Sequence, residues 1–132
     1  MAETHARAEQ AILDEERRAL ARWAQGSPTA YAEVFAGDAT YFDDIGAQTR
    51  IDGLDALKAY MASLQGKIPA HRQEILNPKV QVYGDVGILT LRYDVLADDG
   101  SRLARWKATS VYHREDAGWR VVHAHWSTVK ES

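Results

Sequence analysis

The second half of the chain constrains the fold most, because it is typical of one long succession of β-strands. Beyond residue 69, segments rich in Val, Ile, Tyr, Thr and Trp alternate with turn signals, which are GD at 84–85, DDG at 98–100 and EDAG at 115–118. This pattern predicts four antiparallel strands joined as a meander. Pro78 cannot donate a backbone hydrogen bond, so we expect the first of these strands to bend, to bulge or to lie at a sheet edge.

The first half of the chain predicts helices. An amphipathic helix is expected over 8–25, because apolar residues recur there at helical spacing. Ser27 followed by Pro28 is typical of a helix start and predicts a short second helix that Gly37 closes. A third helix is predicted from about residue 54 to 66. The apolar positions of the first helix are Ile12, Leu13, Leu20 and Trp23.

Length and composition limit the classes of protein to consider. With 132 residues, 45% of them apolar, the chain has the size of a single domain spanning 1–132. It contains no cysteine, and its 19 acidic and 16 basic residues form no basic stripe for nucleic acid. No apolar run approaches the roughly 20 residues of a membrane span, and the N-terminus lacks a signal-peptide pattern. We therefore expect a cytoplasmic protein without nucleic-acid or membrane partners.

Both faces of the predicted sheet carry bulky apolar side chains. Helices are available for only one face, so the other face is expected to pack against a partner, most simply an identical subunit. Alternation assigns the side chains to two sets. The first set is Ile88, Trp106, Tyr112, Val122 and Trp126; the second is Leu89, Leu91, Tyr93, Val111 and Val121.

A pocket is predicted on the face that carries Trp106 and Trp126. Small and polar residues between these large ones leave a concavity rather than a filled core. They are Thr90, Arg92, Ala108, Ser110 and Ala124. Arg92 requires either an acidic partner within the protein or an anionic ligand, and the sequence leaves both open.

Two further features contain side chains that could carry chemistry. His123 and His125 point to one face of a strand and could share a metal ion, but the interpretation we favour is a structural role, so no metal is expected. The stretch TYFDDIG (40–46) places Asp43 and Asp44 side by side. One of them could act as a general base in an aromatic cavity, or both could be solvated in a turn.

Four stretches together resemble the nuclear transport factor 2-like (NTF2-like) superfamily, which includes SnoaL-like and ketosteroid isomerase-like proteins. The resemblance extends in particular to the association domain of calcium/calmodulin-dependent protein kinase II and its stand-alone bacterial relatives. It implies a cone-shaped α+β fold, with N-terminal helices packed on a strongly curved antiparallel sheet that encloses a pocket. The stretches are DGLDALKAYM (52–61), EILNPKVQVYGD (74–85), ILTLRYDV (88–95) and TSVYHREDAGWRVVHAHWS (109–127).

The resemblance also implies roles for individual residues. Asp43 matches the catalytic aspartate of ketosteroid isomerase-like members, whereas Ala19 and Ser110 stand where those enzymes have their oxyanion donors. Arg92 matches a pocket arginine of the kinase association domain, and Ser110 and Trp126 replace two others. His123 and His125 then lie on the outer face, which faces another subunit.

The sequence thus predicts a protein that binds a small anionic or carbonyl-bearing molecule. It could be a cofactor-independent isomerase or lyase with Asp43 as catalytic base; the alternative is a non-catalytic oligomerisation or ligand-sensing module. A homodimer through the outer sheet face is expected, and a higher oligomer is left open. The predicted binding residues are Tyr41, Arg92, Trp106, Ser110 and Trp126.

Overall fold

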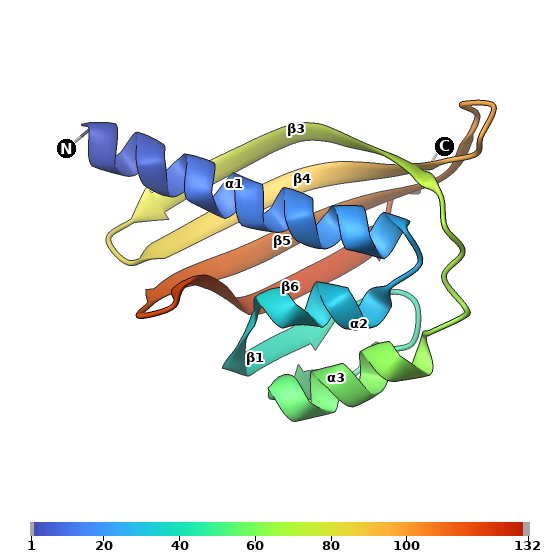
Figure 1. Cartoon of the computed structure of the whole chain (residues 1–132), viewed down its shortest axis with the longest axis horizontal. Coiled ribbons are helices and arrows are strands. Elements are labelled where there is room, and N and C mark those ends of the chain that lie inside the picture. Colours follow the sequence, from blue (N-terminus) through green and yellow to red (C-terminus); the bar gives the residue numbers. More distant parts are fainter. Residues whose placement is uncertain (1, 131–132) are drawn as a thin grey trace.

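The computed structural model describes residues 2–130 as helices followed by a curved sheet (Figure 1). None of its described helices is long and apolar enough to cross a membrane. The elements in chain order are α1 (Ala2–Ala24), α2 (Pro28–Tyr31), a 3-10 turn (Ala32–Val34), β1 (Phe35–Phe42), β2 (Ile51–Asp52), α3 (Leu54–Ser63), β3 (Arg72–Tyr83), β4 (Val86–Leu96), β5 (Arg102–Glu115) and β6 (Gly118–Thr128).

The sheet has six strands in the order β2-β1-β6-β5-β4-β3. Strands β3 to β6 form the predicted antiparallel meander. Strand β1 runs parallel to β6, so the prediction of a wholly antiparallel sheet is wrong at this pairing. The two strands are far apart in the sequence, and the connection between them is long enough to return the chain in the same direction. The α+β cone predicted from the sequence is confirmed.

The first strand begins earlier and ends earlier than predicted. The second helix was expected to continue to Gly37, but α2 ends at Tyr31 and β1 begins at Phe35. Phe35 pairs with Val121 of β6, and this tertiary pairing overrides the local helical preference. β1 then ends at Phe42, so the DD pair of TYFDDIG lies in the turn that follows the strand.

Strand β3 lies at the edge of the sheet and is irregular where Pro78 predicts it. The pairing with β4 shifts between Leu76 and Lys79, and Asn77 adopts a positive φ of 51°. An asparagine tolerates this left-handed conformation better than most residues. The expected bulge at an edge strand is therefore confirmed.

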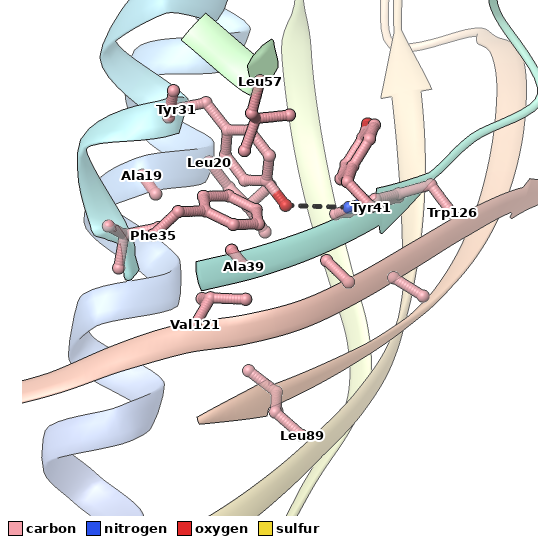
Figure 2. Packing of buried hydrophobic residues seen from close by; sticks show 14 of the residues in the cluster. Ala19, Leu20, Tyr31, Phe35, Ala39, Tyr41, Leu57, Leu89, Val121 and Trp126 are labelled. Carbon is pink, nitrogen blue, oxygen red and sulfur yellow. Dashed lines mark hydrogen bonds between the residues drawn. The ribbon is translucent and has the colours of Figure 1, made fainter. Parts of the chain in front are cut away.

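All three helices lie on one side of the sheet, which we call the inner face (Figure 1). Helix α1 packs closely on β4, because a Cβ atom at Gly87 would lie 2.3 Å from Ile12 Cδ1. A larger residue at position 87 would have to displace the buried end of the Ile12 side chain, so glycine favours this approach. Leu20, Tyr31 and other side chains of the helices meet the inner face in one core (Figure 2).

The pairing of β4 with β5 corrects the predicted assignment of side chains to faces. Leu89 lies opposite Ser110, and Tyr93 lies opposite Trp106, so odd-numbered residues of β4 share the inner face with even-numbered residues of β5. The sequence interpretation had kept even-numbered residues together across this hairpin. A change of one residue in the register of a hairpin moves every side chain of a strand to the opposite face. Ile88 therefore lies with Val111 on the face away from the helices, the outer face.

Candidate functional site

A small cavity lies between the helices and the inner face of the sheet, and we call it the aromatic cavity. Its volume is about 30 Å³. Five aromatic rings and two aliphatic side chains surround it, and they come from α1, α2, β1, β5, β6 and the turn after β1. They are Leu20, Trp23, Tyr31, Tyr41, Ile45, Trp106 and Trp126.

Direct contacts between rings fix the walls of the aromatic cavity. The indole Nε1 of Trp126 donates a hydrogen bond of 2.8 Å to the hydroxyl of Tyr31 (Figure 2). The Tyr31 ring also packs edge-on against Trp23, with ring centroids 5.7 Å apart. Edge-to-face packing and the buried hydrogen bond both stabilise one arrangement of the rings.

Asp43 does not line this cavity but bonds Tyr41 of its wall; it lies in the turn after β1 and is 3% exposed. One carboxylate oxygen, Oδ1, accepts hydrogen bonds from the backbone N–H groups of Ile45 (2.8 Å), Gly46 (3.0 Å) and Ala47 (2.9 Å). The side chain thus closes its own turn, which is a frequent use of aspartate. The alternative of a solvated Asp43 is wrong, whereas the neighbouring Asp44 is exposed.

The other oxygen of Asp43, Oδ2, accepts hydrogen bonds from two tyrosine hydroxyls. Tyr41 donates at 2.9 Å and Tyr60 at 2.7 Å. Burial, followed by the charges of Tyr31 and Asp43, raises the pKa of Tyr41 well above its ordinary value. Five donors thus surround one carboxylate, and a base must free a lone pair before it can accept a proton from a substrate.

A second buried carboxyl, Glu16, was not among the predicted site residues. It is 1% exposed, Oε1 accepts a hydrogen bond of 2.6 Å from the Tyr112 hydroxyl, and Oε2 has no partner among the described residues. Burial raises the pKa of Glu16 to about 7, although the Tyr112 hydrogen bond opposes the shift. A signal exists in the sequence, because Glu16 lies midway between Ile12 and Leu20 on the apolar stripe of the first helix.

The five predicted binding residues separate into three places. Tyr41, Trp106 and Trp126 line the aromatic cavity. Ser110 points into the core beneath the helices, where it is 1% exposed and its hydroxyl has no partner among the described residues. Arg92 lies on the outer face opposite Lys107, so the prediction that it shares a face with Trp106 and Trp126 is wrong.

The two histidines of the last strand lie on the outer face, as expected. His123 is paired with Val111, and His125 with Thr109. Nδ1 of His123 lies 2.7 Å from the Thr40 hydroxyl oxygen. Burial, followed by the neighbouring His125, lowers the pKa of His123. Within residues 2–130, no group of three His, Asp or Glu side chains could hold a metal ion.

A shallow groove of about 650 Å³ runs over the outer face, and we call it the outer groove. Its floor is mostly polar, because threonine, serine, histidine and lysine side chains alternate along the three strands. The lining residues are Thr90, Leu91, Lys107, Ala108, Thr109, His123, His125 and Ser127.

Helices over one face of a curved sheet, with a small cavity between the two layers, define the NTF2-like class of α+β proteins. The family model described as the calcium/calmodulin dependent protein kinase II association domain matches residues 8–130. The chain belongs to this family.

Solved structures agree with this assignment. A protein of Parabacteroides distasonis, provisionally named a ketosteroid isomerase, is 31% identical with a TM-score of 0.77; the match covers 90% of this chain and 86% of that one. The CaMKII hub of S. rosetta is 28% identical with a TM-score of 0.74, covering 92% and 96%. An NTF2-like protein of unknown function from Pseudomonas putida is 24% identical with a TM-score of 0.70, covering 92% and 89%, and it supports the fold alone.

Proposed function

We propose that this chain is a self-associating domain and that its outer sheet face forms the contact between identical subunits. The observation that carries the proposal is a set of partly exposed apolar side chains on that face, beside the mostly polar outer groove. Ile88 of β4 and Val111 of β5 lie opposite each other, and Phe42 lies on β1. No described helix covers them (Figure 1). A sheet face of this kind is stabilised when a second subunit removes it from water.

Family membership supports the same proposal. The matching family is an association domain, and the similar chain of S. rosetta is a CaMKII hub. A homodimer related by a two-fold axis is the simplest assembly, because one self-complementary face then serves both subunits. A larger assembly would use the same contact together with a second one.

The test is the mass of the protein in solution, measured by analytical ultracentrifugation at micromolar concentration. We expect the wild-type chain to sediment as a dimer or larger species, and Val111→Glu to sediment as a monomer because a charge is buried at the contact. Ala59→Glu is the matched control, since Ala59 is exposed on α3, on the helix side of the sheet. A monomeric wild type, or a Val111→Glu variant of unchanged mass, would contradict the proposal.

A second candidate function is the binding of a small molecule in the aromatic cavity. It is favoured by the convergence of five rings from separate elements on a volume that they do not fill. Turnover of such a molecule would use Asp43 as the base, which would first have to release some of its five donors. If Asp43→Asn retained full turnover of any substrate that the wild type accepts, Asp43 would have no catalytic role.

A further inference from the structure

Among the described residues that line the aromatic cavity there is no Lys, Arg or His side chain. The arginine predicted to bind an anion there, Arg92, lies on the opposite face of the sheet. The Trp126 N–H is engaged by Tyr31, and the other donors of the lining side chains are neutral hydroxyl and indole N–H groups. An anion would find little to replace its hydration shell in this place.

Two buried carboxyl groups, Asp43 and Glu16, act on tyrosines that line the aromatic cavity. Asp43 is bonded to the Tyr41 hydroxyl at 2.9 Å. The pKa of Tyr31 is raised well above its ordinary value, first by burial and then by the charge of Glu16, with Asp43 adding to it. Both carboxyls therefore act on tyrosines of the wall. Glu16 contributes a full negative charge only above about pH 7, and the field of the ionised carboxyls favours a positive ligand.

The rings themselves also favour a positive ligand. The face of an indole or phenol ring carries partial negative charge, and a cation within about 6 Å of the ring centre is attracted to it. Tyr41 donates its proton to a carboxylate, which polarises the phenol and increases the electron density of its ring. Three tryptophans and two tyrosines around one small volume therefore form a cage for a cation.

We propose that the aromatic cavity is a binding site for a small organic ammonium ion. This inference rests on the second candidate function and names the chemical class of its ligand. The volume of about 30 Å³ suits the head group of a small alkylamine rather than a ring system. Ile45, which is 40% exposed, marks the side from which the ligand enters.

The first test compares ligands on the wild-type protein. Tryptophan fluorescence is followed during titration with methylammonium, tetramethylammonium and choline chlorides, with KCl at matched ionic strength as blank. The neutral molecule 3,3-dimethylbutan-1-ol has the shape of choline without its charge, and acetate supplies the opposite charge. We expect saturable binding of at least one ammonium ion, and binding at least tenfold weaker for the neutral analogue and for acetate.

The second test locates the ligand. Ring currents should shift the N-methyl proton resonance of the bound ammonium ion upfield in NMR spectra, because aromatic faces surround it. We expect Trp106→Leu to weaken binding by about fivefold or more, since Trp106 is a partly exposed wall of the cavity. Trp119→Leu is the matched control, because Trp119 lies away from the cavity, against Arg114. Thermal unfolding of both variants shows whether they remain folded.

The outcomes distinguish two claims: that the cavity binds a small molecule, and that this molecule is an ammonium ion. Equal affinity for choline and its neutral analogue, or preferential binding of acetate, would overturn the ammonium site but leave ligand binding intact. Absence of saturable binding of every probe up to 100 mM (about 1.4 kcal/mol of binding free energy) would overturn both. An unchanged affinity in Trp106→Leu with an unshifted N-methyl resonance would place the ligand elsewhere and overturn the assignment to this cavity. None of these results bears on self-association.

Discussion

The two buried carboxyls of this protein, Asp43 and Glu16, have nearly equal exposure but very different surroundings. Asp43 is 3% exposed and accepts five hydrogen bonds, three of them from its own turn. Glu16 is 1% exposed and accepts one, from Tyr112. Burial alone therefore does not determine the role of an acid in this core; the number of donors around it does.

The difference follows from where each residue lies in the chain. Asp43 ends a strand, where the backbone N–H groups of a turn are free to bond a side chain. Glu16 lies in mid-helix, where the backbone N–H groups are already used within the helix and only a side chain from the sheet can reach it. Asp43 therefore stabilises its local structure as an acceptor, whereas Glu16 is a buried acid whose protonation changes near neutral pH.

Replacing Asp43 should have the largest effect. Asp43→Ala leaves several buried or partly buried donors without an acceptor, and each costs about 1 to 3 kcal/mol, so we expect a loss of about 4 kcal/mol in the free energy of unfolding. Urea denaturation at pH 7 measures it. Asp44→Ala is the control, because Asp44 is exposed and, among the residues that the structure describes, bonds Thr128 alone. Equal losses in the two variants would mean that the five donors of Asp43 contribute no special stability.

Replacing Glu16 should produce a smaller, pH-dependent increase in the free energy of unfolding. Between pH 4.5 and about 7 the folded chain keeps the Glu16 proton that the unfolded chain has released, so stability falls as the pH rises through this range. The total fall is about 3 kcal/mol. We expect Glu16→Gln to remove it, so that the variant is more stable than the wild type at pH 8 and equal to it at pH 4.

Unfolding in urea across pH 4 to 8 measures this effect. Glu9→Gln is the control, because Glu9 lies exposed on the same helix. Parallel stability curves for the wild type and Glu16→Gln over the whole range would show that the burial of Glu16 has no electrostatic consequence.

Replacing Tyr112 should have the smallest effect on stability but sharpens the comparison. Its hydroxyl opposes the upward shift of the Glu16 pKa. We expect the free energy of unfolding of Tyr112→Phe to be about 1 kcal/mol lower than that of the wild type. As the pH rises, it should also continue to decrease beyond pH 7, because the Glu16 pKa moves higher. Urea unfolding between pH 6 and 9 measures both. Tyr83→Phe, at a position that is 64% exposed, should change neither the stability nor its pH dependence. If the stability of Tyr112→Phe stopped falling at the same pH as that of the wild type, the role of this hydrogen bond would be contradicted.

Much of the fold could be predicted from local patterns. The meander, the third helix and the bulge near Pro78 each follow from residues adjacent in sequence. The parallel pairing of β1 with β6 could not be predicted in this way, because nothing in either strand specifies its partner. The face of Arg92 was mispredicted for a related reason: alternation fixes faces within a strand, but the turn between strands fixes them across a hairpin.

The site was predictable to the extent that its residues are aromatic. Trp106 and Trp126 were singled out because large residues stood among small ones, and they do line the cavity. Glu16 was overlooked because an acidic residue in an amphipathic helix is normally assigned to solvent, and only its spacing from Ile12 and Leu20 indicates otherwise.

The parallel contact between β1 and β6 also determines when the fold can be completed during synthesis. Phe35 and Tyr41 meet Val121 and Ala124, more than 80 residues further along the chain. Strand β1 therefore leaves the ribosome long before its partner β6 exists, and its apolar side chains stay exposed in the meantime. For a chain of this topology, chaperone binding should concentrate on the N-terminal third and end once the last strand has emerged.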